Sequence, residues 1–70
     1  MNKMNTEILD LTKNLSYFAQ KINTKVKQAL EVELNNRASP NVIDSYGKIG
    51  IAIDNINYCL ELIEEDIKKI

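Results

Sequence analysis

The 70-residue sequence contains no histidine and no tryptophan, and it has a single cysteine, Cys59. Without histidine there can be no Ser-His or Cys-His pair and no ready proton shuttle near neutral pH. A metal site would need carboxylates almost alone, and one thiol cannot form an intramolecular disulfide. We therefore expect a protein that is not an enzyme and that has no cofactor and no metal site.

Long apolar runs are also absent. None approaches the ~20 residues of a membrane span, and MNKMNTEILD lacks the apolar core of a signal peptide. A single unpaired thiol suits a reducing compartment, so we expect a cytoplasmic protein without a membrane partner. The net charge of −1 argues against nucleic-acid binding, because such domains are usually strongly basic.

Proline and glycine are scarce, and the strongest break in the chain is NNRASP, residues 35–40. Ser39 suits an N-cap position and Pro40 the first position of a helix. Asn35 or Asn36 can end the preceding helix, which Asn5 or Thr6 can begin. The sequence predicts an all-α antiparallel hairpin in one domain, residues 1–70, with helices over about 5–35 and about 40–70.

Apolar residues recur at helical spacing on both sides of this break, which favours helices over strands. The first stripe consists of Ile8, Leu11, Leu15, Phe18, Ile22, Val26, Leu30 and Leu34. The second stripe consists of Val42, Tyr46, Ile49, Ile53, Ile56, Leu60, Ile63, Ile67 and Ile70. Folding the chain at the break matches the stripes in eight layers, such as Ile8 with Ile67, Leu15 with Leu60 and Ile22 with Ile53.

The charges favour the same pairing. Residues 11–30 contain four lysines and no acid, whereas residues 49–67 contain five acids and no base. The predicted hairpin places Lys13 beside Glu61 and Glu64, and Lys21 beside Asp54. Exposed pairs of this kind contribute only ~0.2–1 kcal/mol each, but they disfavour a parallel or shifted arrangement.

Two helices leave each apolar stripe half covered, and a chain of this size buries little surface alone. The sequence therefore predicts a coiled-coil-like assembly with a second copy, a four-helix homodimer, and the alternative is a monomer with a thin core. Cys59 is expected as a small buried thiol beside this core. The predicted oligomer core consists of Phe18, Ile22, Ile49, Ile53, Ile56, Leu60 and Ile63.

A second group of residues lies off the stripe of the second helix. Two glycines inside a helix cost about 0.5–1 kcal/mol each relative to alanine, so a closely approaching partner could account for them. The alternative is a kink, or a loop over SYGKIG with the helix beginning near Ile51. The predicted partner-binding residues are Gly47, Gly50, Ile51, Tyr58 and Leu62.

The segment SYGKIGIAIDNINYCL, residues 45–60, resembles the start of the second helix in small phage "sponge" proteins of the anti-CBASS 2-like type. The resemblance covers less than a quarter of the chain and rests on Gly47 and Lys48. It implies an oligomeric hairpin that sequesters a cyclic nucleotide, with Gly47 and Lys48 contacting phosphate. The arginine expected further along is absent, and Tyr58 and Glu61 lie in that region.

The leading hypothesis is a small oligomeric binding protein, a phage or mobile-element regulator or inhibitor that binds a host protein through its second helix. One alternative is the cyclic-nucleotide sponge, with Lys48 at an oligomer interface. Another is an RNA-binding dimer that uses the ridge of Lys13, Tyr17, Lys21 and Lys25, where lysines would contact phosphate and tyrosine a base. The acids on the second helix weaken the positive field that RNA binding requires.

Overall fold

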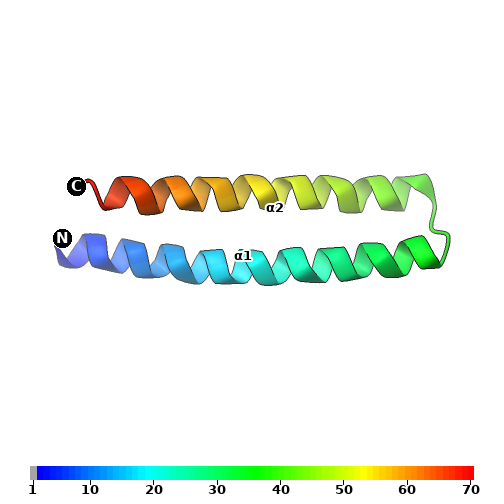
Figure 1. The fold of residues 1–70 in the computed structure, drawn as a ribbon, viewed down its shortest axis with the longest axis horizontal. Coiled ribbons are helices and arrows are strands. Elements are labelled where there is room, and N and C mark those ends of the chain that lie inside the picture. Colours follow the sequence, from blue (N-terminus) through cyan, green and yellow to red (C-terminus); the bar gives the residue numbers. More distant parts are fainter. Residues whose placement is uncertain (1) are drawn as a thin grey trace.

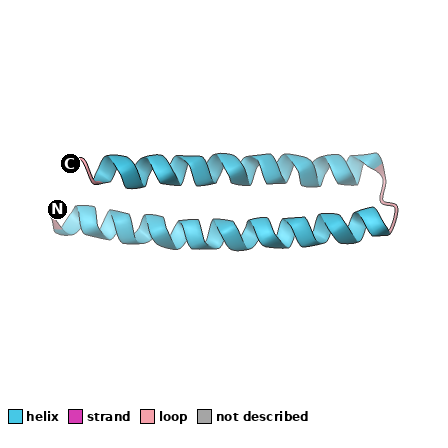
Figure 2. Cartoon of the chain, in the orientation of Figure 1, coloured by secondary structure: helices cyan, strands magenta, loops and turns pink. Residues whose placement is uncertain are grey.

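The computed structural model describes residues 2–70 and contains two antiparallel helices, α1 (Lys3–Asn35) and α2 (Pro40–Ile67) (Figures 1 and 2). They lie side by side over their whole length, with both chain ends at one end of the hairpin and the turn at the other. The predicted all-α hairpin is confirmed. The helix bounds agree with the predicted ones to within three residues.

The two helix starts differ in how they are capped. α1 begins earlier than predicted, because the Asn2 side chain accepts a hydrogen bond from the backbone N–H of Asn5 at 2.8 Å. Ser39 stands at the predicted N-cap of α2, and Pro40 follows it as the first helical residue. The Ser39 hydroxyl makes no capping bond, and its backbone carbonyl instead accepts from the N–H groups of Val42 and Ile43.

The left-handed residue of the turn is an arginine, and not one of the two asparagines that were expected to end α1. Asn36 is the C-cap of α1 but keeps a negative φ of −90°. Arg37 takes the positive φ of 56°, a conformation that costs most residues about 1 kcal/mol or more. The N–H of Ala38 then reaches the carbonyl of Glu33 at 2.9 Å, which satisfies one carbonyl of the last turn of α1.

The surface between the two helices, here called the seam, follows a heptad pattern on each. On α1 its buried or half-buried positions are mostly small or polar: Asn5, Leu9, Thr12, Ser16, Ala19, Asn23, Val26, Leu30 and Glu33. On α2 they are Ile43, Tyr46, Gly50, Ile53, Asn57, Leu60, Glu64 and Ile67. The hydroxyl of buried Thr12 donates to the carbonyl of Ile8 at 2.7 Å, so this polar group is satisfied within α1.

Most of the predicted layers are therefore wrong for α1, although Leu30 and Tyr46, which form one of them, are both half-buried in the seam. Ile53, Leu60 and Ile67 are buried as expected, but their predicted partners Ile22, Leu15 and Ile8 remain 42–58 % exposed. α1 is rotated so that its line of small residues, with Thr12 and Ala19 buried, faces α2. Small side chains permit two helices to approach closely. Most of the large apolar residues of α1 are left outside the seam, and Leu9, Val26 and Leu30 are the ones that lie in it.

The hairpin is long and has a thin core. Its longest dimension is 52 Å and its radius of gyration is 16.0 Å, against about 11 Å for a compact domain of this length. Its accessible surface is 5557 Å², whereas a compact monomer of 8.0 kDa would have about 4,450 Å². Roughly 1,100 Å² more surface is thus exposed than a self-contained domain of this mass would expose.

The predicted ion pairs between the helices do not form among the described residues. The two salt bridges join residues three or four apart in the second half of the chain, Lys48 with Asp44 at 3.0 Å and Lys69 with Asp66 at 3.4 Å. All four side chains are exposed, so each pair contributes little to stability. Within residues 2–70, neither helix combines the length and the apolarity needed to cross a membrane.

Candidate interaction surfaces

The first surface is an apolar flank of the hairpin, formed by both helices. On α1, Ile8, Leu15 and Ile22 each come one residue before a seam position, and on α2 the same is true of Ile49, Ile56 and Ile63. Because the helices are antiparallel, positions with the same offset from the seam lie on the same side of the pair. The apolar flank comprises Met4, Ile8, Leu11, Leu15, Phe18, Ile22, Ala29 and Val32 of α1, and Val42, Ser45, Ile49, Ala52, Ile56, Cys59 and Ile63 of α2.

These residues form a second heptad line on each helix, beside the line that makes the seam. Their large members are between about a third and three quarters exposed, so the flank is solvent-accessible along the hairpin. The residues of the predicted oligomer core are divided between the seam and the apolar flank. Ile53 and Leu60 are buried in the seam, whereas Phe18, Ile22, Ile49, Ile56 and Ile63 lie on the apolar flank.

Cys59 lies on the outer edge of this flank and is exposed, so its expected burial is wrong for the single hairpin. It directly precedes the seam residue Leu60 and lies about 100° round the helix from it, which turns the thiol away from α1. Ala52 and Ser45 occupy the equivalent positions one and two heptads earlier. The α2 side of the flank therefore alternates isoleucine with small residues.

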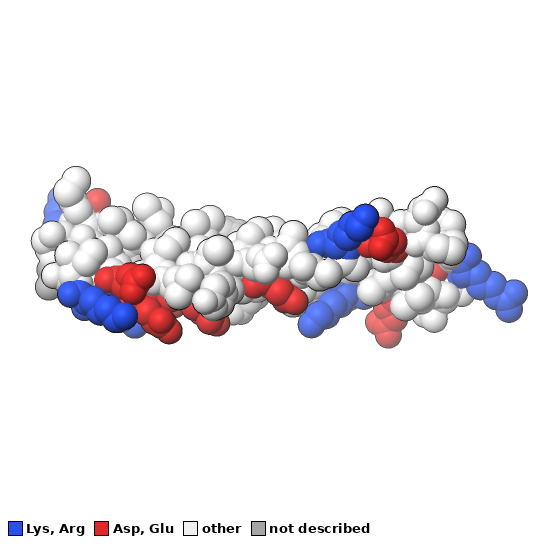
Figure 3. Space-filling model, turned by 90° about the horizontal axis from the view of Figure 1, so that it is seen from above, with Lys and Arg blue, Asp and Glu red and all other residues white. Residues whose placement is uncertain are grey.

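The opposite flank is polar. Lys13 and Lys27 of α1 and Asp54 and Glu61 of α2 each follow a seam position by four residues, which places all four on this side. Figure 3 shows the same division: charged side chains gather along one long edge, and much of the other edge carries no charge. Lysine and acid thus share a flank as the sequence suggested, without forming ion pairs.

The second surface is a small outer cluster on α2, composed of Ile51, Tyr58 and Leu62. Their spacings of seven and four residues put them on one face of the helix, directed away from α1. Ile51 and Tyr58 are 64 % and 62 % exposed, and Leu62 is 40 % exposed. The three side chains thus share a face that α1 does not cover.

Neither glycine of the predicted partner-binding group belongs to this cluster. Gly50 is half-buried in the seam toward α1, and Gly47 is exposed at the edge of the polar flank. α2 passes through both as a regular helix, so the alternative of a loop over SYGKIG is wrong. A methyl group at either glycine would meet no neighbouring side chain and no atom of α1 within 4 Å.

Lys48, the predicted anion contact, is held by Asp44 in the 3.0 Å salt bridge described above. An anion at this ammonium group would compete with a carboxylate one turn away on the same helix. Gly47 is beside it but lies in mid-helix, where its N–H belongs to the helical hydrogen-bond ladder. The phosphate contact at Gly47 and Lys48 stays a prediction.

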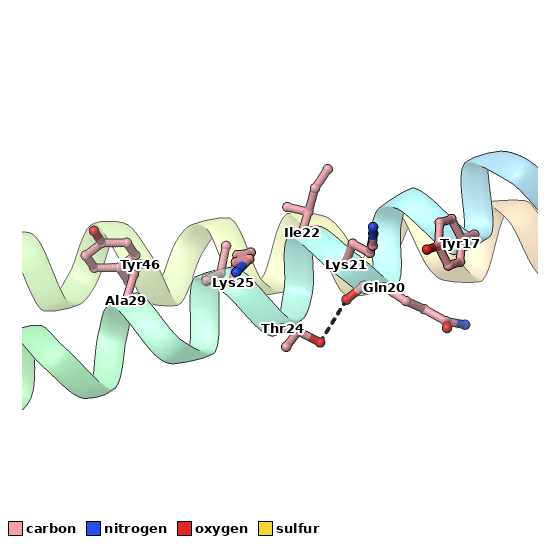
Figure 4. Close-up of a pocket in the computed structure, with 9 residues that line it drawn as sticks. Tyr17, Gln20, Lys21, Ile22, Thr24, Lys25, Ala29 and Tyr46 are labelled. Atoms are coloured by element: carbon pink, nitrogen blue, oxygen red, sulfur yellow. Dashed lines mark hydrogen bonds between the residues drawn. The ribbon is translucent and has the colours of Figure 1, made fainter.

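The basic ridge of α1 borders an open groove of about 750 Å³ (Figure 4). Lys21 places its Nζ 5.0 Å from the ring centre of Tyr17, and Tyr17 makes an edge-on contact with Phe18 at 5.5 Å. A base stacking on Tyr17 would compete with this cation–π contact. The groove extends past Ile22 to Ala29 and to Tyr46 of α2, where it joins the apolar flank.

We compared the chain with protein-family models, with curated proteins and with solved structures, and none of them matches it. The two surfaces must therefore be interpreted from their own chemistry.

Proposed function

We propose that this chain is a non-enzymatic binding protein that acts as a homodimer in the cytoplasm, as a regulator or inhibitor of phage or mobile-element origin. In this proposal the apolar flank holds two copies together, and the outer cluster on α2 binds a host protein. The observation that carries the proposal is that exposed apolar side chains occupy two separate surfaces on different sides of α2.

The size of the flank supports its role in self-association. Nine of its side chains, each 36–63 % exposed, present on the order of 800 Å², which matches the area per partner in a standard stable interface. Burial of this surface would also remove most of the excess accessible area of the single hairpin. The nine residues are Ile8, Leu11, Leu15, Phe18, Ile22, Val42, Ile49, Ile56 and Ile63.

The outer cluster would remain exposed in such a dimer, because it is directed away from the flank. Its centre, Tyr58, combines apolar area with a polar hydroxyl, a side chain common at the energetic centre of interfaces. Asp54 and Glu61 lie one turn on either side of Tyr58, so the border of the cluster is acidic. A partner groove that is apolar inside and rimmed by lysine or arginine fits this surface.

A photo-crosslinking amino acid at Leu62, beside Tyr58, tests this assignment in a bacterial extract. We expect one protein to be crosslinked by the dimer, and we expect the double variant Ile51→Asp and Tyr58→Asp to lose it while staying dimeric. Capture should also weaken as salt rises, because the acidic border is solvent-exposed. If the double variant keeps the mass of a dimer and still crosslinks the same protein, α2 does not bind that protein through this cluster.

A further inference from the structure

The two halves of the apolar flank differ in the size of the side chains on their outer edges: the edge on α1 is wide and the edge on α2 is narrow. The α1 half carries a large side chain at almost every position from Ile8 to Ile22, with Leu11 and Phe18 on its outer edge. On the α2 half, the outer edge at the corresponding heptad position is small: Ser45, Ala52 and Cys59. A close-packed interface requires that large positions on one surface meet small positions on the other.

Two kinds of two-fold symmetry can cover one flank with another. With the axis parallel to the helices, each α1 lies over the partner's α2, and both turns are at the same end of the bundle. With the axis perpendicular to the helices, α1 lies over α1 and α2 over α2, and the turns are at opposite ends. All neighbouring helices are antiparallel in both cases, so helix direction does not distinguish them.

We infer that a second copy of this chain covers the apolar flank about an axis parallel to the helices, with each α1 against the partner's α2 and both turns at the same end. This inference rests on the proposed homodimer and adds its geometry. It sets Phe18 over the partner's Cys59 and Val32 over the partner's Ser45, a large side chain over a small one in each case. With the perpendicular axis, the large outer side chains of α1 would meet those of the partner's α1, and the small ones of α2 would meet those of the partner's α2.

Charge favours the same arrangement. Residues 49–67 of α2 carry five acids and no base, and residues 11–30 of α1 carry four lysines and no acid. With the parallel axis, the two acidic helices occupy opposite corners of the four-helix bundle, and each has the lysine segment of an α1 helix, residues 11–30, on both sides. With the perpendicular axis, the two copies of α2 would be neighbours, and their like charges would repel.

Nitroxide labels at the turn distinguish the two arrangements. Ser39 suits this purpose because it is exposed and its hydroxyl makes no capping bond. In the variant Ser39→Cys with Cys59→Ser, a distance measurement between the two labels of the dimer should give about 20–30 Å, the width of a bundle of helices ~10 Å thick plus the labels. A matched label at Lys3→Cys, at the other end of α1, should give a similar short distance.

A separation close to the 52 Å length of the hairpin at Ser39 would overturn this arrangement and leave the proposed homodimer standing. If the labelled and the unlabelled protein both have the mass of a monomer, the homodimer and its arrangement are both overturned. Short label distances at the turn and at the other end of α1, together with the mass of a dimer, would support the homodimer and this arrangement.

Discussion

Ile53 and Ile56 lie one turn apart on α2, yet Ile53 is 6 % exposed and Ile56 is 47 % exposed. Ile53 faces α1 in the seam, and Ile56 lies on the apolar flank. The regular isoleucine stripe of α2 is thus divided between a surface that the chain covers itself and a surface that it leaves open. An apolar stripe on each helix that is wider than one neighbour can cover is typical of a helix with two neighbours, as in a four-helix bundle.

Aspartate at Ile56 should dissociate the dimer. Burial of an isoleucine stabilises by ~1.5–3 kcal/mol, and each dimer contains two copies, so we expect the dissociation constant to rise by about 100-fold or more. The matched control is Ile51→Asp, which changes the same residue type on the outer face of the same helix. Sedimentation at several concentrations should show weakened association for the first variant alone. Equal behaviour of the two variants would contradict the assignment of the flank.

Alanine at Gly47 or Gly50 should stabilise the protein. Both glycines are in regular helix, and an added methyl group would meet no neighbouring side chain within 4 Å. We expect the free energy of unfolding in urea to rise by about 0.5–1 kcal/mol for each substitution. A loss of stability or of dimerisation would instead show that another backbone approaches closely at that glycine.

Leucine at Asn57 should also stabilise the protein. The Oδ1 atom of Asn57 is buried in the seam and accepts no hydrogen bond from the described residues. A buried polar group without a partner costs about 1–3 kcal/mol, so its replacement should raise the free energy of unfolding by about 1 kcal/mol. Asn55→Leu, at an exposed position two residues earlier, is the control and should change stability by less than about 0.5 kcal/mol. Destabilisation by Asn57→Leu would mean that the amide is bonded in the native assembly.

The thiol of Cys59 reports on coverage of the flank without any substitution. It is exposed in the single hairpin, but the partner's α1 would cover it in the proposed dimer. We expect a thiol reagent to modify native Cys59 at least several-fold more slowly than Cys59 in urea, and more slowly still as protein concentration rises. If Cys59 is modified in the native protein as fast as in urea at every protein concentration, the flank is not covered in the native protein.

The hairpin could be predicted from the sequence because its signals are local. Pro40 fixes where α2 begins, and the heptad spacing requires helices on both sides of the turn. Periodicity also identifies which residues share a face of a helix. It does not identify which neighbour covers that face, and for this reason the layers that paired Leu15 with Leu60 were wrong.

Most of the seam on α1 escaped prediction, because only Leu9, Val26 and Leu30 among its residues are large and apolar. Thr12, Ser16 and Asn23 are polar, and only their small size suits a close approach of α2. The one indication was Ala19, a small residue beside a stripe of large ones. The predicted ion pairs failed for a different reason: long exposed side chains lose conformational entropy when held in one geometry, so charges on a shared flank need not pair.

The mass of the protein in solution, measured by light scattering on a sizing column over a range of concentrations, tests the central claim most directly. We expect a dimer with twice the 8.0 kDa mass of one chain, which dissociates only on dilution. A mass of 8.0 kDa at every concentration would contradict it, because the apolar flank would then be open in the native protein.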